Sequence, residues 1–356
     1  MPSRRAHVVQ EQPESAAARP ESQPKILPGW AIATIVSVGV VLVAAIAATV
    51  WMFLNHWVRD LTATAPAVGT TIIAPEESKA ALALPGLADG TDEFAATDYL
   101  AAQPTAYWLT PEIDPVSEIG ARMTNLLSEA RTQGKALAIV VYGLPERDCS
   151  AGLSAGGLDD AAYAEWTQII GEALHSAPDI QKTVVLEPDS LALAPECGNT
   201  AERTEQLRNA ITRLASTNTW IYVDGGHSTW LPASQMAELI NGIGMNDVIR
   251  GFATNVSNYN DTAIEFDYAH QLSGLTGGLH AIVDTSRNGA GSNGEWCNPP
   301  GRLIGAPGGT YGDDVVDTNL WIKPPGESDG TCNGGPVAGA WWPQSAVELT
   351  RNVTLP

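Results

Sequence analysis

Two aspartates follow short apolar segments of the chain, at 140–148 and 184–189. Each segment runs from β-branched residues into a turn and then reaches Asp148 or Asp189. Short apolar runs are typical of buried parallel strands, and in barrel-type α/β enzymes reactive side chains lie just past the carboxyl ends of such strands. Glycoside hydrolysis needs one carboxyl group protonated and others charged, and neighbouring acids push their pKa values apart. Either aspartate alone could be a helix cap or a loop residue, but together they indicate carbohydrate chemistry.

The sequence around these aspartates resembles a known enzyme family. Residues 140–157 (VVYGLPERDCSAGLSAGG) and 184–192 (VVLEPDSLA) resemble the two signatures of glycoside hydrolase family 6, the inverting cellulases. Five further segments match in the same order: 223–230 (VDGGHSTW), 253–259 (ATNVSNY), 284–289 (DTSRNG), 295–297 (EWC) and 321–330 (WIKPPGESDG). The resemblance spans roughly residues 100 to 350 and implies an inverting hydrolase of β-glucans.

The resemblance gives each acidic residue of the expected site a role. It implies that Asp189 is the general acid and that Asp148 supports it, since a nearby negative charge raises the affinity of Asp189 for its proton. Asp224 matches an aspartate that binds and tunes the site, although it could equally cap the following glycines. Tyr142 is expected to press on the sugar at the cleaved bond. A strand tyrosine is otherwise usually a core residue.

The base is the least secure role. Asp329 matches the family's candidate base, and in inverting enzymes such a base can act through a second water. Ser154 corresponds to a serine that helps to hold this water. In a loop rich in glycine and alanine, a serine would otherwise indicate only flexibility.

Six further residues match positions that bind the glucan in the family: Trp230, Trp296, Lys323, Glu327, His227 and Asn255. Aromatic faces stack on the apolar faces of glucose rings, while charged groups form strong oriented hydrogen bonds to hydroxyls. The alternatives are buried structural tryptophans and exposed ion pairs. His227 and Asn255 have the weaker claims.

The surrounding pattern predicts how these residues are positioned. Apolar β-rich runs occupy 105–109, 136–142, 183–187, 219–224, 248–253, 279–284 and 319–322. Helical periodicity occupies 116–132, 161–175, 204–215 and 262–275. Alternating strands and helices predict a parallel sheet. We therefore expect an α/β fold: a distorted, incomplete parallel (β/α) barrel of about seven strands, with a substrate groove at its carboxyl-terminal face, preceded by one transmembrane helix.

The amino terminus divides into three expected parts before a catalytic domain at 96–356. Residues 1–26 resemble a disordered cytoplasmic tail, and 57–95, rich in Thr, Ala, Pro and Gly, resemble a flexible tether. The stretch 27–56 is long and apolar enough for a membrane anchor, with a cleaved signal sequence as the alternative. Basic residues precede it, which predicts a cytoplasmic amino terminus and an extracytoplasmic catalytic domain. Cleavage would make that domain a secreted one.

Four cysteines, Cys149, Cys197, Cys297 and Cys332, allow three pairings by arithmetic alone. Cys149 and Cys197 each lie just beyond a strand that ends near a candidate aspartate, so they should share one rim of the barrel and pair there. Cys297 and Cys332 would then form the second bridge, which is also the family's pattern. Four buried thiols or a metal site are the alternatives, but without CxxC pairs zinc is not expected.

Charge and composition limit the partners. The net charge is −21, and the first 26 residues hold four basic and three acidic residues, so the remainder carries about −22. Such a chain has no basic patch for nucleic acid. No GxGxxG follows the first strand, and no cofactor is expected. We expect a monomer that acts on a β-glucan polysaccharide and contacts a membrane only through its amino-terminal helix.

These observations predict a membrane-anchored endoglucanase that hydrolyses internal β-1,4-glucosidic bonds of cellulose-like glucans with inversion. Endo action is favoured because only two residues separate Asp329 from Cys332, a loop shorter than the one that roofs the tunnel of the family's cellobiohydrolases. The alternatives are a cellobiohydrolase and a non-catalytic cell-surface glucan-binding protein. A binding protein would be free to lose Asp189 or Asp329, yet both are present.

Overall fold

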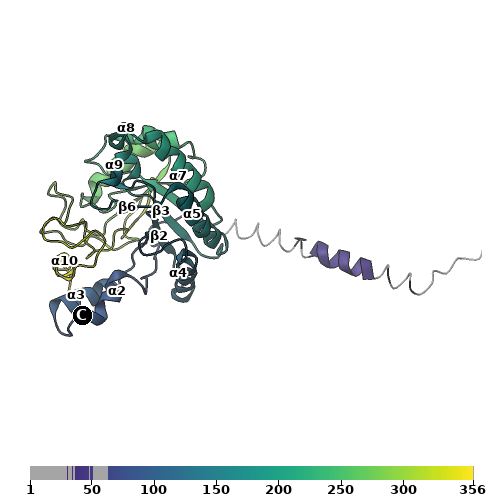
Figure 1. The fold of residues 1–356 in the computed structure, drawn as a ribbon, viewed down its shortest axis with the longest axis horizontal. Helices are drawn as coiled ribbons and strands as arrows, with labels where there is room; N and C mark the ends of the chain where they lie inside the picture. The colour runs from purple at the N-terminus through teal and green to yellow at the C-terminus, as the bar shows by residue number, and fades with distance from the viewer. Residues whose placement is uncertain (1–29, 31–33, 35–36, 48, 51–62, 356) are drawn as a thin grey trace, which may run out of the picture. The chain divides into compact units, whose positions relative to one another are not determined.

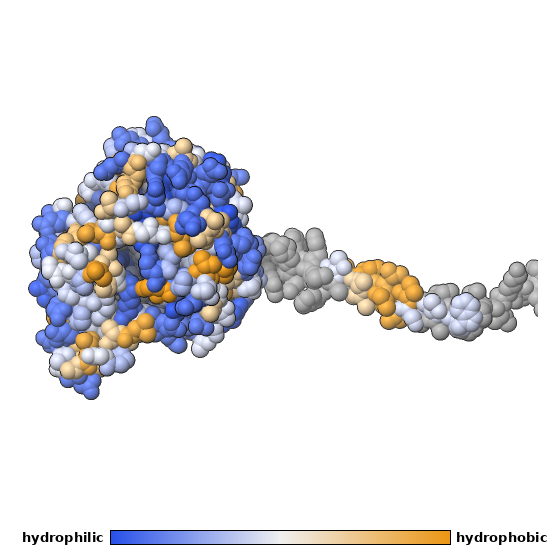
Figure 2. Space-filling model, in the orientation of Figure 1, coloured by the Kyte–Doolittle hydropathy of each residue, from blue (hydrophilic) through white to orange (hydrophobic). Residues whose placement is uncertain are grey.

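A computed structural model describes residues 30, 34, 37–47, 49–50 and 63–355. The chain divides into two compact units between Trp57 and Val58. In the first unit, residues 37–47 form a largely apolar helix (Figure 2). Among the described residues, no helix is both long enough and apolar enough to span a membrane. The expected tail at 1–26 lies outside the described residues and the expected anchor at 27–56 lies partly outside them, so both stay predictions.

The second unit is built on a seven-stranded parallel sheet whose strands follow one another in chain order. Its strands are β1 (Tyr107–Leu109), β2 (Leu137–Val141), β3 (Lys182–Leu186), β4 (Thr219–Asp224), β5 (Gly251–Thr254), β6 (His280–Asp284) and β7 (Val316–Leu320). Each expected strand is present, with ends shifted by at most three residues. The sheet curls until its two edges approach, because the backbone N–H of Ala106 donates to the Trp321 carbonyl at 2.9 Å. In the described strands β1 and β7 share no ladder, so the expected incomplete barrel is confirmed.

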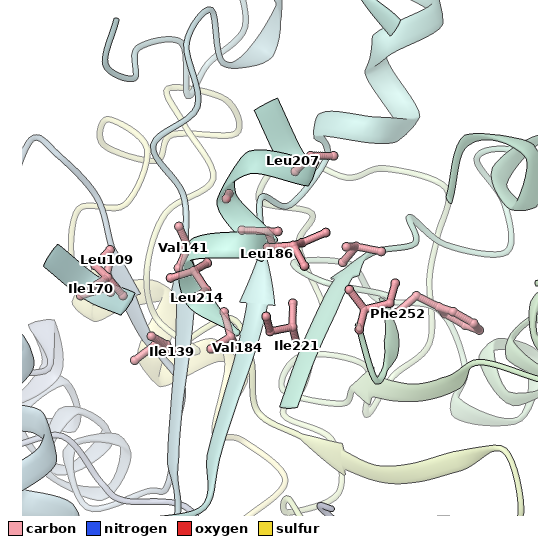
Figure 3. Packing of buried hydrophobic residues seen from close by; sticks show 14 of the residues in the cluster. Leu109, Ile139, Val141, Ile170, Val184, Leu186, Leu207, Leu214, Ile221 and Phe252 are labelled. Carbon is pink, nitrogen blue, oxygen red and sulfur yellow. The ribbon is translucent and has the colours of Figure 1, made fainter. Parts of the chain in front are cut away.

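Alternate residues of each strand point to opposite faces, and this period creates two cores. Ile139, Val141, Val184 and Leu186 face outward against the helices, as Figure 3 shows for the packing around Ile170. The residues between them face into the barrel and form a second apolar cluster that includes Ala138, Val140, Val185, Tyr222 and Ile282. Both faces are buried, which explains why these strands read as continuous apolar runs rather than as alternating ones.

Helices cover the outer face of the sheet (Figure 1). The longer ones are α4 (Ile119–Gln133), α5 (Asp160–His175), α7 (Thr200–Leu214), α8 (Ala233–Ile243) and α9 (Thr262–Leu275). Four of these five were expected from periodicity. Helix α8 was not expected, although Met236, Ile240 and Ile243 repeat at helical spacing and are fully buried. Two further helices, α6 (Ser190–Cys197) and α10 (Pro343–Leu349), were not expected either, because they are too short for a reliable periodic signal.

The expected tether at 57–95 is wrong from residue 63 onward, where the structure is described. Ile72 and Ile73 are buried, and Ile72 forms a parallel bridge with Ala136 at the base of β2. Two helices follow, α2 (Lys79–Ala83) and α3 (Asp92–Ala101), and α3 packs on α10 (Figure 1). We misread a docked segment as a linker because its Thr, Ala, Pro and Gly residues satisfy turns and short helices as well as they suit a tether.

The contact between α5 and α7 provides a test of the packing. A Cβ atom at Gly171 of α5 would lie 2.1 Å from the carbonyl oxygen of Arg213. We predict that Gly171→Ala lowers the free energy of unfolding by about 3 kcal/mol, because the two helices must separate. Gly274→Ala in α9 is the matched control: its methyl group meets nothing within 4 Å, so helix propensity should raise stability by about 0.5–1 kcal/mol. Melting temperatures that move in the same direction would contradict this packing argument.

Candidate active site

The inward-facing positions of the strands change from apolar to polar at the carboxyl end of the sheet. Tyr142 follows β2, while Asp224 and Asp284 are the last residues of β4 and β6. Each lies two residues after an inward-facing residue of its strand, namely Val140, Tyr222 and Ile282 respectively, and therefore points to the same side. The period of two therefore delivers these polar side chains to one rim of the barrel, as the sequence analysis expected for Tyr142 and Asp224.

Asp189 lies just past β3, in the left-handed backbone region with φ 68°. Its backbone N–H donates to Asp224 Oδ2 at 3.1 Å, which holds this strained turn. Within the described residues, neither carboxyl oxygen of Asp189 makes a hydrogen bond. Burial raises the pKa of Asp189 well above its usual range, and repulsion from the nearby carboxyl groups of Asp224, Asp148 and Asp329 raises it further. The carboxyl group is therefore biased toward its protonated form, and both of its oxygens are unpaired within the described residues.

Asp224 holds the turn that carries Asp189. It is only 2% exposed, and its Oδ2 accepts from the N–H groups of both Asp189 and Gly226 at 3.1 Å. Burial raises its pKa to about 7. Its contacts are backbone donors, so it shapes the turn that carries Asp189.

Asp148 and Tyr142 form the facing wall. The Tyr142 hydroxyl donates to Asp148 Oδ1 at 3.3 Å, and the backbone N–H of Ser154 donates to Asp148 Oδ2 at 3.0 Å. Arg147 lies over the Tyr142 ring, with its guanidinium carbon 4.3 Å from the ring centre. Ser154 thus contacts Asp148 through its backbone, and the expected part of its hydroxyl in holding water stays a prediction.

Asp329 is held by an ion pair that the sequence analysis did not anticipate. Arg287 Nη1 lies 2.9 and 3.1 Å from its two oxygens, and Arg287 is only 2% exposed. The Tyr259 hydroxyl and the backbone N–H of Asn298 both donate to Oδ2 at 3.0 Å. Among the described residues Oδ1 accepts only from Arg287, so it keeps a lone pair for another donor.

Both disulfides join the expected partners. Cys149 pairs with Cys197 and Cys297 pairs with Cys332, with Cα–Cα distances of 5.4 and 6.1 Å. The first bridge ties the loop after Asp148 to the end of α6, which begins just after Asp189. The second bridge holds the loop around Asp329. The pairing prediction is confirmed, and each bridge fixes a loop that carries a candidate catalytic residue.

The two bridged loops touch each other. A Cβ atom at Gly330 would lie 2.5 Å from Leu153 Cδ1, so Leu153 packs directly on this glycine. The loop with Asp148 and Ser154 therefore meets the loop with Asp329. The short segment between Asp329 and Cys332 does not by itself leave an open groove, because the opposite loop reaches it.

The expected sugar-binding residues fall into three groups. Lys323 and Glu327 are buried and paired, with Nζ 3.6 Å from Oε2. His227 and Trp230 lie together, with ring centres 5.6 Å apart, and burial lowers the pKa of His227 to about 4, so this histidine is neutral at pH 7. Trp296 is 58% exposed beside Cys297, as suits a stacking platform.

Asn255 is not brought to the cleft. It is fully buried, and its amide nitrogen donates to the carbonyl oxygens of Asp284 and Asn260 at 2.9 and 3.3 Å. Its φ of 62° marks a left-handed turn after β5. These hydrogen bonds hold loops together. No contact among the described residues supports a role of Asn255 in substrate binding, and that role stays a prediction.

Several neighbouring residues were missed by sequence reasoning. Trp108 in β1 lies edge-on to Tyr142, with ring centres 5.2 Å apart, and Lys323 Nζ is 5.1 Å from its ring. Glu187 accepts from the N–H groups of Gly143 and Leu144, and burial raises its pKa to about 7. Arg287 and Glu187 both lie in segments that matched the family, which was the available signal.

A group with metal-ligand chemistry lies elsewhere. Within the described part of the chain, His270, Asp313 and Asp314 are close enough together to hold an ion, and all three are exposed near the amino end of β7. His270 Nε2 already contacts Asp313 Oδ2 at 2.9 Å. Surface acidic groups of this kind are common, and the group takes no part in the cleft.

Comparison with known proteins agrees with this geometry. The sequence profile described as "Glycosyl hydrolases family 6" matches residues 68–353. "Endoglucanase A" of Cellulomonas fimi is 40% identical over 266 residues, covering 74% of this chain and 58% of that protein. "1,4-beta-D-glucan cellobiohydrolase CEL6B" of Podospora anserina is 33% identical over 300 residues, covering 70% and 71%. The chain thus spans little more than half the length of the Cellulomonas relative.

Solved structures share the fold. The endoglucanase Cel6 from Mycobacterium tuberculosis, in complex with methyl-cellobiosyl-4-deoxy-4-thio-β-D-cellobioside, gives a TM-score of 0.74 at 36% identity and covers 81% of this chain and 99% of that chain. Cellobiohydrolase II (Cel6A) from Humicola insolens, in complex with glucose and cellotetraose, gives 0.67 at 29% identity and covers 78% and 95%. A profile match over most of the chain, joined to a relative 40% identical, means that this chain belongs to glycosyl hydrolases family 6.

Proposed function

We propose that this protein hydrolyses β-1,4-glucosidic bonds inside cellulose-like glucans, with inversion at the anomeric carbon. The observation that carries the proposal is Asp189: a carboxyl group with a raised pKa, free of hydrogen bonds within the described residues and surrounded by three other aspartates. This is the arrangement that a general acid requires at neutral pH. The names of the related endoglucanases support the substrate class.

The proposed reaction follows from the contacts. Asp189 gives its proton to the oxygen of the glycosidic bond, and the bond between that oxygen and the anomeric carbon breaks. A water attacks the anomeric carbon from the opposite face and loses a proton toward Asp329 Oδ1, through a second water if the distance requires one. Arg287 remains paired with Asp329 and keeps its negative charge in place. Repulsion from Asp148 helps to sustain the high pKa of Asp189.

Endo action is our preferred mode, and exo action is the second candidate. The short link between Asp329 and Cys332 and the endoglucanase names of the 40% identical relatives favour endo cleavage. The contact between Leu153 and Gly330 favours a roofed cleft and so supports the cellobiohydrolase alternative. Release of reducing ends from carboxymethyl cellulose with a rapid fall in viscosity would support endo action. Activity on neither polymer nor oligosaccharide would favour a glucan-binding protein instead.

We also propose that the catalytic unit acts outside the cytoplasm. Its two disulfides form and persist in oxidising compartments. The apolar amino-terminal stretch would serve as its anchor or signal.

The stereochemical prediction concerns the first product. Hydrolysis of a β-linked cello-oligosaccharide by the full chain should release the α-anomer first, because a water attacks opposite the departing oxygen. Proton NMR during the first minutes of turnover, before mutarotation, distinguishes the anomers. Release of the β-anomer would indicate a covalent intermediate and would remove Asp329 from the role of base.

Asp189→Asn tests the identity of the acid. Without a proton donor, cleavage of unactivated glucan should fall by roughly 100- to 10,000-fold, whereas a substrate with a good leaving group should lose much less. Asp89→Asn, an exposed site on the same unit, is the control and should retain full activity. Equal losses on both substrate types would exclude Asp189 as the acid.

Asp148→Asn tests the source of the raised pKa. Activity requires protonated Asp189. The enzyme is therefore active at pH values below the pKa of Asp189 and loses activity as the pH rises through that pKa. Replacement of the Asp148 carboxyl by an amide removes one source of repulsion and lowers that pKa, so the basic limb of kcat/KM should move to lower pH. An unchanged basic limb, measured on the same glucan, would show that Asp148 does not tune Asp189.

A further inference from the structure

Lys79 places a positive charge at the end of the candidate cleft, from a segment that the sequence analysis treated as a tether. It is the first residue of α2, whose amino end is fixed by Ser78, since the Ser78 hydroxyl accepts from the Ala81 N–H at 3.2 Å. The Lys79 Nζ lies 3.3 Å from Glu327 Oε2. It also lies close to Gly339, where a Cβ atom would stand only 3.0 Å from Nζ.

Both lysines contact the same oxygen of Glu327. Lys79 and Lys323 contact Oε2 at 3.3 and 3.6 Å, while Oε1 accepts no hydrogen bond from the described residues. Glu327 is only 6% exposed, so its orientation is set by these two ammonium groups rather than by water. A carboxyl group with one oxygen paired to ammonium groups and the other oxygen free is suited to accept a hydrogen bond from a hydroxyl group.

The contacts of Lys323 place this group relative to the reacting centre. Its Nζ lies 5.1 Å from the Trp108 ring, and Trp108 lies edge-on to Tyr142, which donates to Asp148. A continuous wall therefore runs from Asp148 through two aromatic rings to Glu327. A sugar bound beside Glu327 would therefore lie at a distance from the cleaved bond and would not be one of the two sugars that this bond joins.

The segment that carries Lys79 is rigidly docked. The Gln133 side chain of α4 forms two hydrogen bonds with the backbone of Ala74, at 3.2 and 3.1 Å. Glu77 forms an ion pair with Arg122 of the same helix. Lys79 is 27% exposed and reaches Glu327 from a fixed backbone, so its ammonium group is positioned rather than freely moving.

We propose that Lys79 is a positioning residue of the glucan site, which holds Glu327 so that Oε1 accepts from a hydroxyl of a sugar beyond Trp108. This inference rests on the proposed function, because it assigns Lys79 to the binding of the same β-glucan. Lys79 does not touch the reacting atoms. Lys79 should therefore affect the binding of longer glucan chains, since only these reach Glu327.

Lys79→Met removes the charge and keeps most of the side-chain length. For cellohexaose we expect KM to rise roughly five- to fifty-fold with kcat changed less than about two-fold, because a remote contact made equally in ground and transition states is lost. Lys79→Arg, which keeps the charge, should recover most of the affinity. Lys135→Met is the matched control elsewhere on the unit and should leave both constants unchanged.

A double-mutant cycle separates a positioning role from a general loss of charge. If Lys79 acts through Glu327, then Lys79→Met should have little further effect on oligosaccharide binding in a Glu327→Gln chain. Binding is followed by tryptophan fluorescence, which also works without turnover. Additive effects, or unchanged binding in Lys79→Met, would overturn this inference alone. Failure of the unmutated chain to bind or cleave any cello-oligosaccharide would overturn the proposed function as well.

Discussion

Crowding of carboxyl groups at one end of the barrel is the constraint on which the site depends. A buried carboxylate is unfavourable unless it is paired or accepts hydrogen bonds. Asp329 has Arg287, Glu327 has two lysines, and Asp284 accepts from four backbone N–H groups. Asp189 alone among the central acids has no such partner within the described residues. The surrounding acids are therefore satisfied individually, whereas burial and then repulsion from Asp224, Asp148 and Asp329 raise the pKa of Asp189.

Strained backbone turns bring these carboxyl groups close together. Glu187, Asp189 and Asp148 all have positive φ angles, between 50° and 68°, which non-glycine residues rarely adopt. Hydrogen bonds hold each turn: Asp224 accepts from the Asp189 N–H, and Glu187 accepts from the turn after β2. The disulfide between Cys149 and Cys197 ties together the two loops that carry these turns. Residues that look catalytic by type, such as Glu187, here support the geometry of their neighbours.

Local sequence signals predicted the sheet well and the long-range pairs poorly. Every strand was found, because burial on both faces makes each one a short apolar run bounded by turns. The positions of Asp148, Asp189 and the pair Cys149–Cys197 followed from the ends of those strands, whereas the pair Cys297–Cys332 followed by elimination and from the resemblance to the family. The partners Arg287 and Lys79 did not, since an ion pair between residues 42 or 248 positions apart leaves no local pattern. The docked segment before residue 96 was missed for the same reason: the contacts that dock it, such as the bridge of Ile72 with Ala136, join residues distant in the chain.

The incomplete closure of the barrel and the location of the site have one cause. At the seam between β1 and β7, the Ala106 N–H reaches Trp321, and the Trp108 side chain donates to the Ile322 carbonyl at 2.8 Å. A full ladder would have used these backbone groups and closed the wall. Because the chain leaves β7 here instead, Lys323 follows directly after Ile322 and lies beside Trp108. The seam thus places Trp108 and Lys323 together, and the docked amino-terminal segment that supplies Lys79 also contacts it, since the Thr105 N–H donates to the Ile73 carbonyl.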